Sequence, residues 1–394
     1  MRFPEFSGEW KEHQLHNVCK LLSGGTPALD ISCYWNGNIP FISATAMHKP
    51  YIIDSEQYLS EEGLVHGSKL LKQGNLLLLV RGSMLWKRIP VCYNRVDVAF
   101  NQDVKGIIPN NVTNSLFLLY WFLSQENRIK YMVTGTGIGA GKLDMEDLLS
   151  MKILLPLQDE QRKVVSLLQL IDARIATQNK IIEKYESLIK GLNDSLYAQY
   201  GDDVLTSFSS LGFSYSGLSG KSAQDFGSGK PFITYLNVYS NNIINEKDFQ
   251  YVAIKEGEKQ NVVEYGDVLF TLSSETPEEV GIGSVYLGNE NVYLNSFCFG
   301  IHIINTKIVF PPYLSYYVSS TPFRKFIYPY AQGSTRFNLC KVDFERASIK
   351  LPTLENQKRI YSILSHIESK TETEKSLLDL YNSQKQYLLR QMFI

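Results

Sequence analysis

The fold is decided by residues 155–199, which read LPLQDEQRKVVSLLQLIDARIATQNKIIEKYESLIKGLNDSLYAQ. After Gln161, apolar side chains recur at alternating steps of three and four residues, which is the a/d pattern of a coiled coil. Only Gly191 interrupts residues that favour helix, so we predict a helix of about 40 residues, roughly 60 Å long. A seam of this length needs a partner to cover it. Its seam residues are Val164, Leu168, Ile171, Ile175, Ile182, Tyr185 and Ile189.

The same pattern returns near the C-terminus. Pro352 and Gln357 match Pro156 and Gln161 with one common offset of 196 residues (352 − 156 and 357 − 161). The second seam contains Ile360, Leu364, Ile367, Leu378 and Tyr381, and it is weaker because Thr371, Glu374 and Lys385 occupy three of its positions. We expect the two helices to pair with each other. The alternative is two unrelated amphipathic helices, each packed on its own globule.

The segments before the two helices repeat a common plan as well. Residues 230–234 (KPFIT) correspond to residues 39–43 (IPFIS), and residues 265–270 (YGDVLF) correspond to residues 73–78 (QGNLLL). The offset drifts between 191 and 194, as loops of differing length would cause. We therefore predict a tandem repeat with boundaries at 1–154 (globule), 155–200 (helix), 201–350 (globule) and 351–394 (helix). Two globules that share a backbone plan but differ in their loops are expected if the loops recognise two different ligands.

Local signals predict the elements of the first globule. Gly, Pro and Asn punctuate its short apolar runs, which favours turns between strands. We expect strands at Pro40–Ser43, Leu76–Val80, Val91–Tyr93, Val96–Phe100 and Lys152–Leu155, helices at Ser115–Arg128 and Asp144–Leu148, and a glycine-rich loop at Met132–Lys142.

Composition narrows the class of protein. The 394 residues carry 39 Lys and Arg against 40 Asp and Glu, so the net charge of −1 does not by itself indicate nucleic-acid binding. The five cysteines form no CxxC pair, and residues 1–10 do not resemble a signal peptide. The longest apolar runs are too short to span a bilayer. We expect a cytoplasmic protein with no membrane partner.

Catalytic motifs are missing from the sequence. Residues 135–142 (GTGIGAGK) resemble a phosphate loop, but Thr136 replaces a required glycine and Leu143 replaces the Ser or Thr after the lysine. The histidines lack metal-ligand spacing, and neither a Gly-x-Ser-x-Gly elbow nor an Asn/Asp-Pro-Pro-aromatic motif occurs. Glu61-Glu62 and Glu278-Glu279 are interpreted as solvated loop charges. We expect no catalytic residues, no metal and no cofactor in this chain.

Charge placement is more informative than total charge. No acidic residue occurs in Leu64–Arg95 or in Asn291–Val342, whereas both windows contain basic and aromatic residues. Basic side chains neutralise phosphates, and Asn, Gln, Ser and Arg bind base edges. The alternative is a half-buried sheet that excludes acids. The candidate DNA-binding residues are Ser43, Thr45, Lys49, Arg81, Ser83, Trp86, Lys87, Arg88, Lys142, Thr234, Asn237, Tyr239, Ser273, Ser274, Ser334 and Arg336.

Taken together, these motifs resemble the specificity subunits of type I restriction-modification systems, over essentially the whole chain. The resemblance rests on residues 24–27 (GGTP) with Trp35, on Leu155-Pro156 with Glu160-Gln161, and on Leu351-Pro352 with Gln357. The second copy departs from the Glu-Gln pair by carrying Asn356 before Gln357.

The resemblance implies an α+β fold, with two similar globular target recognition domains separated by a pair of long antiparallel coiled-coil helices in pseudo-two-fold symmetry. Each domain would read one half of a bipartite gapped site in double-stranded DNA. It also implies two methyltransferase subunits that methylate adenine with S-adenosylmethionine. Two restriction subunits, acting as motor-nucleases with ATP and magnesium, would complete the complex, and this chain itself would be non-catalytic.

Three other functions stay open from the sequence alone. An adaptor whose globules bind protein would show no salt-dependent DNA binding. A methyltransferase or nuclease acting alone would modify DNA without other subunits. The recognition segment of a fused restriction-methylation enzyme would keep the DNA-reading role in a different system.

Overall fold

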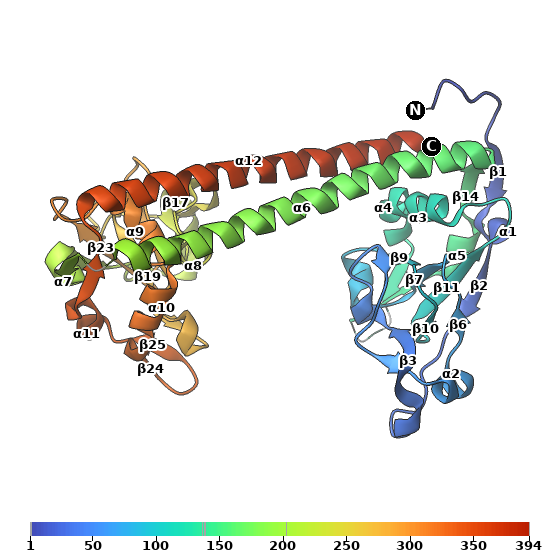
Figure 1. The fold of residues 1–394 in the computed structure, drawn as a ribbon, viewed down its shortest axis with the longest axis horizontal. Coiled ribbons are helices and arrows are strands. Elements are labelled where there is room, and N and C mark those ends of the chain that lie inside the picture. Colours follow the sequence, from blue (N-terminus) through green and yellow to red (C-terminus); the bar gives the residue numbers. More distant parts are fainter. Residues whose placement is uncertain (1, 136, 138, 202, 394) are drawn as a thin grey trace. The chain divides into compact units, whose positions relative to one another are not determined.

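The computed structural model describes residues 2–135, 137, 139–201 and 203–393. They divide into two compact units, which we call unit 1 (residues up to Asn179 and from Ser376 onward) and unit 2 (Lys180–Lys375). Helix α6 (Gln158–Tyr200) passes from unit 1 to unit 2 and helix α12 (Leu354–Met392) returns, so the two helices run antiparallel (Figure 1). The predicted α+β class with two long antiparallel helices is confirmed.

Unit 1 is built on a buried sheet with the strand order β2-β11-β7-β9-β4. All four residues of its central strand β7 are fully buried, which explains their uninterrupted leucine sequence. The strands are β2 (Cys19–Ser23), β4 (Tyr51–Ile52), β7 (Leu76–Leu79), β9 (Val91–Asn94) and β11 (Val104–Pro109). Beside this sheet, β1 (Lys11–Gln14) pairs antiparallel with β14 (Lys152–Leu155), the strand that leads into α6.

Two further sheets complete the strands of unit 1. One has the order β5-β3-β10-β6 and contains β3 (Trp35–Ile42), β5 (Tyr58–Leu59), β6 (Leu70–Leu71) and β10 (Val98–Phe100). The other has the order β12-β13-β8 and contains β8 (Arg81–Gly82), β12 (Val133–Gly135) and β13 (Gly141–Leu143). We call it the small sheet of unit 1.

Short helices connect these strands. Asn114 caps α3 by accepting hydrogen bonds from the N–H groups of Leu116 and Phe117, and Asp144 caps α5 in the same way. Helix α3 lies against the first half of α6 (Figure 1), where the Tyr120 hydroxyl donates to Asp172 at 2.7 Å. The helices are α1 (Leu15–Val18), α2 (Glu61–Gly67), α3 (Ser115–Ser124), α4 (Glu126–Lys130) and α5 (Met145–Ser150).

Unit 2 repeats the plan of unit 1. Its sheets have the orders β15-β26, β16-β23-β19-β21, β18-β17-β22 and β20-β25-β24, the last being the small sheet of unit 2. The strands are β15 (Val204–Thr206), β16 (Gly212–Ser216), β17 (Phe226–Ile233), β18 (Gln250–Val252), β19 (Val268–Thr271), β20 (Ser273–Ser274), β21 (Gly283–Val285), β22 (Tyr293–Leu294), β23 (Cys298–Ile303), β24 (Ala331–Gln332), β25 (Phe337–Leu339) and β26 (Ile349–Leu351). The shorter helices are α7 (Phe208–Leu211), α8 (Tyr235–Ser240), α9 (Pro311–Tyr317), α10 (Thr321–Ile327) and α11 (Lys341–Arg346).

The glutamines of the repeated motif make the same contacts in both units. The Gln161 side chain accepts from the Asn114 N–H at 2.7 Å and donates to the carbonyls of Val112 and Pro156. The Gln357 side chain accepts from the Phe310 N–H at 2.7 Å and donates to the carbonyls of Ile308 and Pro352. Every partner is displaced by 196 residues, which is the offset seen in the sequence. Gln161 therefore ties the start of α6 to the loop before α3, and Gln357 ties the start of α12 to the loop before α9.

The seam residues of the long helices lie in the cores of the units. In unit 1, Val164, Leu168 and Ile171 of α6 join one buried cluster with Leu388, Leu389 and Met392 of α12 and with Phe393. In unit 2, Ile360 and Leu364 of α12 are buried, and Ile189 and Leu192 of α6 pack on their cluster. The remaining predicted seam residues are buried or half-buried, namely Ile175, Ile182, Tyr185, Ile367, Leu378 and Tyr381.

Several expected elements differ in extent. The strand predicted at Pro40–Ser43 begins at Trp35, because a bulge between Trp35 and Ile39 lets its pairing with β5 continue. The helix predicted at Ser115–Arg128 breaks at Gln125, whose backbone leaves the helical region and starts α4. The predicted glycine-rich loop Met132–Lys142 is wrong as a plain loop, because its ends pair as β12 and β13. Its Thr136 and Ile138 lie outside the described residues. The strands expected at Leu76–Val80 and Lys152–Leu155 are confirmed.

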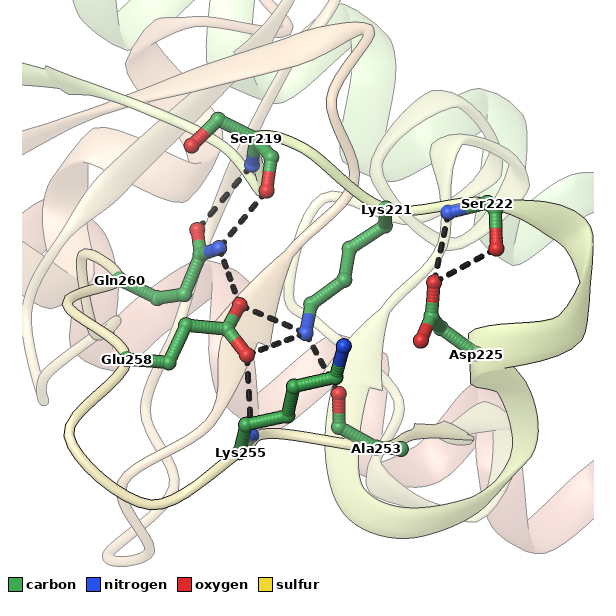
Figure 2. A network of polar contacts seen from close by, with 8 residues as sticks. All are labelled: Ser219, Lys221, Ser222, Asp225, Ala253, Lys255, Glu258 and Gln260. Carbon is green, nitrogen blue, oxygen red and sulfur yellow. Dashed lines mark hydrogen bonds and ion pairs between the residues drawn. The ribbon is translucent and has the colours of Figure 1, made fainter.

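A polar network fastens the outer loops of unit 2 (Figure 2). The nearly buried Lys221 ammonium donates to Glu258 at 2.6 Å and to the Ala253 carbonyl at 2.6 Å. Glu258 also accepts from the Lys255 N–H and from the Gln260 amide, which in turn bonds both backbone groups of Ser219. These bonds, led by the one from Lys221, lower the pKa of Glu258 to about 2. The network holds loop 219–225 against loop 253–260.

Among the described residues, no helix combines the length and apolar character needed to cross a membrane.

Candidate nucleic-acid interface

The small sheets occupy equivalent places in the two units. In unit 1, β8 follows the buried strand β7 and pairs with β13; in unit 2, β20 follows β19 and pairs with β25. Arg81 and Ser273 are 192 residues apart, and so are Val91 and Gly283 at the next strand (273 − 81 and 283 − 91). The chain between these points therefore has the same length in both units. Side chains at matching positions can be compared directly.

Two cations face each other on the small sheet of unit 1. Arg81 and Lys142 are direct partners in the antiparallel pairing of β8 with β13, and both are exposed. Directly opposed residues of an antiparallel pair have side chains on the same face, and like charges there are destabilising. Within the described ranges, no carboxylate pairs with either cation. The pair thus forms a site that an anion such as a phosphate would stabilise.

Trp86 lies beside this pair. It ends a 3₁₀ turn, Ser83–Trp86, that follows β8, and its indole N–H donates to the Gly139 carbonyl at 3.0 Å. The indole therefore rests on the glycine-rich hairpin, although 48% of the residue is exposed. Ser83 in the same turn is exposed as well. An exposed aromatic face next to cations suits contact with a sugar or a base.

Arg88 connects this turn to the segment after β3. Its guanidinium donates to the carbonyls of Met47 at 2.6 Å and His48 at 3.3 Å. The Ser43 and Thr45 hydroxyls of that segment are hydrogen-bonded to each other at 2.8 Å. With Lys49, they line a hollow of about 640 Å³. The structure thus brings Ser43, Thr45, Lys49 and Arg88 together, and Arg88 serves to position the segment.

Two other cations of the first acid-free window, Lys72 and Arg95, have partners inside the protein. Lys72 forms an ion pair with Asp97 at 2.8 Å, and Arg95 lies 4.6 Å from the centroid of the Tyr51 ring. Lys87 is different, because its side chain is exposed and only its backbone is bound: its N–H donates to the Met84 carbonyl at 2.9 Å, and its carbonyl accepts from the Lys130 ammonium at 3.1 Å. Arg81, Lys87 and Lys142 are therefore exposed to solvent, as are Lys49 and Lys69.

In unit 2 the exposed cation of the small sheet is Arg336. Its Nε donates to the Ser273 hydroxyl at 3.2 Å, and its guanidinium carbon lies 5.9 Å from the centroid of the Phe297 ring. Ser273 itself is only 5% exposed. The buried serine thus accepts from the Nε–H, and no hydrogen bond from the two terminal nitrogens of the guanidinium is found among the described residues.

A carboxylate, Glu279, ends the 3₁₀ turn Pro277–Glu279, which packs against strands β20 and β24 of the small sheet. Glu279 accepts hydrogen bonds from the Tyr239 hydroxyl at 2.7 Å and from the Ser274 hydroxyl at 2.9 Å. Tyr239 stacks on Tyr235, whose hydroxyl donates to the Ser273 carbonyl at 2.9 Å. The bonds from Tyr239 and then Ser274 lower the pKa of Glu279, so the group is ionised at neutral pH.

The other candidates of unit 2 are placed in two ways. Thr234 caps α8 by accepting from the Asn237 N–H, and the 2% exposed Asn237 side chain bonds Asn245 and Asn241. Thr234 and Asn237 therefore stabilise the backbone of α8, the helix that contains Tyr239. Ser334, in contrast, is exposed in the turn between β24 and β25. The candidates of unit 2 are therefore partly at the surface, as Ser334 and Arg336 are, and partly buried, as Asn237 and Ser273 are.

Sequence reasoning missed the part played by Glu279 and Tyr235. Glu279 was interpreted as a solvated loop charge, yet two side-chain hydroxyls hold it in place. The signal that could have found it is its position, because Glu279 matches Lys87 at the same offset of 192 residues. Once the repeat has been recognised, the opposite charges of Lys87 and Glu279 at equivalent positions mark Glu279 as a residue that distinguishes the two units.

Metal-binding chemistry finds no support in this surface. Throughout the part of the chain that the structure describes, no group of three or more His, Cys, Asp and Glu residues is arranged to hold a metal ion. The groups at this surface are cations, hydroxyls, aromatic rings and a few carboxylates, among them Asp54 and Glu56 in the hollow of unit 1. Such groups bind a ligand through phosphates and hydrogen-bonding edges.

Comparison with known proteins agrees with this geometry. The family described as the type I restriction modification DNA specificity domain matches residues 7–187 and 219–380. The EcoR124I/EcoR124II specificity subunit of a type I restriction enzyme from Escherichia coli is 32% identical over 210 residues, or 53% of this chain and 50% of that protein. The MjaIX specificity subunit from Methanocaldococcus jannaschii is 26% identical over 186 residues, or 45% of this chain and 41% of that protein. The chain spans about half the length of the curated relatives that it matches.

Solved structures share the fold along nearly the whole chain. The S subunit of a type I restriction-modification system from M. genitalium is 13% identical, covers 100% of this chain and 99% of its own, and gives a TM-score of 0.55. A chain from a study of complex assembly in a type I R-M system is 15% identical, covers 98% and 97%, and gives a TM-score of 0.60. Because the two matched segments extend over most of its length, the chain belongs to the family of type I restriction modification DNA specificity domains.

Proposed function

We propose that this chain is the DNA-recognition subunit of a type I restriction-modification complex. Each globule reads one half of a bipartite gapped site, and the chain positions methyltransferase subunits for adenine methylation and motor-nuclease subunits for cleavage. The chain itself is non-catalytic. The proposal rests on family membership and on the two matched small sheets.

The proposal depends most on one observation: the two small sheets have the same strand pairing but carry different side chains. Unit 1 presents Arg81 opposite Lys142, whereas the same pairing in unit 2 joins Ser273 to Asn338. A common frame with different exposed groups is what two readers of different sequences require. Sequence is read by side chains that contact base edges, whereas phosphate contacts fix the register.

The partners follow from this role. Double-stranded DNA is the ligand, two methyltransferase subunits supply S-adenosylmethionine chemistry, and two restriction subunits use ATP and magnesium. The support for these partners is that the similar EcoR124I/EcoR124II protein is the specificity subunit of a type I restriction enzyme. This chain contributes binding and orientation only.

A segment exchange tests the modular reading. Residues 201–350 are replaced by the equivalent segment of a relative with a different site, and the chain is expressed with its partner subunits. Mapping of methylated adenines across the host genome should show one half-site changed and the other unchanged. The reciprocal exchange of residues 1–154 is the matched control and should change only the other half-site.

Two results would contradict the proposal. If both half-sites change in either exchange, the globules do not read independently. Methyl transfer to DNA by the purified chain, free of partner subunits and supplied with labelled S-adenosylmethionine, would show that the chain is itself an enzyme.

A further inference from the structure

We propose that Glu279 determines specificity in unit 2 by accepting a hydrogen bond from the exocyclic amino group of a base, the N4 amino group of cytosine. This inference rests on the proposed function and names one determinant within the half-site that unit 2 reads. A carboxylate is an acceptor only, and in the major groove the donors it can meet are the amino groups of cytosine and adenine.

The carboxylate is held in a fixed position. The Tyr239 hydroxyl donates to one oxygen and the Ser274 hydroxyl donates to the other, at 2.7 and 2.9 Å. An ionised carboxylate offers about four acceptor sites, so each oxygen retains capacity for a further donor. Glu279 is half-buried, with one side supported and the other accessible to solvent.

The backbone under Glu279 is fixed as well. The guanidinium of Arg324 donates to the carbonyls of Glu278, Val280 and Gly281 at 2.6–2.7 Å. Arg324 belongs to the second acid-free window, but its three backbone bonds give it a structural role. Glu279 is thus restrained through both its backbone and its side chain, as a base-reading group must be to tell one donor pattern from another.

The matching position in unit 1 carries the opposite charge. Lys87 and Glu279 are 192 residues apart (279 − 87), and chain length from the small sheet to the next strand is the same in both units. A lysine donates to the O6 and N7 acceptors of guanine or to a phosphate, whereas a carboxylate repels both. A carboxylate is poorly suited to a general DNA-binding surface. Its presence next to the small sheet of unit 2, held by Tyr239 and Ser274, is explained if it selects a donor.

The experiment uses the full-length chain expressed with its partner subunits and compares wild type with Glu279→Gln. The glutamine has the same shape, but it presents an amide that pairs with adenine. In genome-wide mapping of methylated adenines, one fixed G·C pair in one half-site should become degenerate or change to A·T, while the other half-site stays the same. If the affected wild-type pair is A·T, the amino group is that of adenine N6 and the assignment to cytosine is overturned.

Control variants separate this role from general effects. Glu278→Gln alters the neighbouring exposed carboxylate, whose side chain has no partner among the described residues, and should leave the site unchanged. Ser274→Ala removes one support but keeps the carboxylate, and should weaken discrimination at the same base pair only. An unchanged site in a methylating Glu279→Gln complex would overturn the inference. A wild-type complex that methylates no gapped site would instead refute the proposed function.

Binding measurements decide the case in which Glu279→Gln abolishes methylation. The purified full-length variant is titrated with duplexes that carry each base pair at the affected position, after thermal unfolding shows that it is folded. A loss of about tenfold to a hundredfold for the cognate duplex alone is expected for one hydrogen bond to a charged acceptor. An equal loss for all duplexes would overturn the inference. If Glu279→Gln does not fold, unchanged discrimination between base pairs in Ser274→Ala would overturn it.

Discussion

Lys385 of α12 forms an ion pair with Asp172 of α6 at 2.6 Å, and both side chains are only 17% exposed. The lysine occupies a seam position that is usually apolar, which made the second seam look weak in the sequence. The same Asp172 also accepts a hydrogen bond from the Tyr120 hydroxyl. A charged seam residue is therefore matched by a partner on the facing helix within unit 1.

A double-mutant cycle should measure this pair. We expect Asp172→Asn and Lys385→Met to show a coupling free energy of about 1–2 kcal/mol, because the pair is largely shielded from water. The Lys72–Asp97 pair, at 73% and 40% exposure, is the matched control and should couple by less than about 1 kcal/mol. All four tryptophans (Trp10, Trp35, Trp86 and Trp121) belong to unit 1, so urea unfolding followed by tryptophan fluorescence reports on this unit. Equal coupling in both pairs would contradict the expectation.

Gln161→Leu should destabilise unit 1 strongly. The buried glutamine bonds one backbone N–H and two carbonyls, and leucine would leave these groups without a partner. We expect the free energy of unfolding to fall by about 3 kcal/mol. Gln158→Leu, one turn earlier, loses a single exposed bond to the Asn111 carbonyl and should cost less than about 1 kcal/mol. Similar losses for both variants would mean that the glutamine contacts are not what fixes the start of α6.

Arg81→Ala and Lys142→Ala should weaken DNA binding while sparing the fold. If each cation neutralises one phosphate, the slope of log K against log salt concentration should decrease in magnitude by about 0.9 per variant. Removing one of two opposed like charges should also leave the free protein as stable, or more stable by a few tenths of a kcal/mol. Lys72→Ala is the control from the same window, and its slope should match that of the wild type. Unchanged slopes for both Arg81→Ala and Lys142→Ala would show that the window is merely structural.

The Lys221–Glu258 network predicts a pH dependence for unit 2. The pKa of Glu258 is about 2 in the folded protein, below its ordinary value of 4.5. A lowered folded-state pKa gives stability that is present above pH 4.5 and is lost as the pH falls toward 2. The free energy of unfolding should therefore fall less steeply across this window in Glu258→Gln than in wild type, measured by urea unfolding and circular dichroism. The exposed Glu256→Gln should behave as wild type, and identical pH profiles for wild type and Glu258→Gln would refute the role of the network.

The sequence predicted those parts of the fold that depend on periodicity and on repetition. Gln161 and Gln357 share an offset of 196 residues, and the structure gives them the same set of contacts. The buried strand at Leu76–Leu79 was evident from its leucines alone. These features follow from local patterns that keep the same meaning wherever they occur in a chain.

Other features depend on tertiary contacts and could not be predicted from local patterns. Gln125 ends α3 although its neighbours favour helix, and the pairing of residues 133–135 with 141–143 converts an apparent loop into a hairpin. In the candidate site, the acid-free windows located both small sheets. They could not separate Arg81, which faces solvent, from Arg324, whose guanidinium bonds three backbone carbonyls.

The division of the chain into units also sets an order of events during synthesis. Unit 2 is one continuous segment, whereas the core of unit 1 is completed by Leu388, Leu389, Met392 and Phe393. A ribosome adds about 5–20 residues per second, so the first globule waits on the order of 10–40 s for its last helix. During that time Val164 and Leu168 lack part of their apolar cover. Unit 2 therefore needs no residue made after Lys375, whereas unit 1 cannot complete its core until Phe393 has been added, which reverses the N-terminal-first order of most multidomain chains.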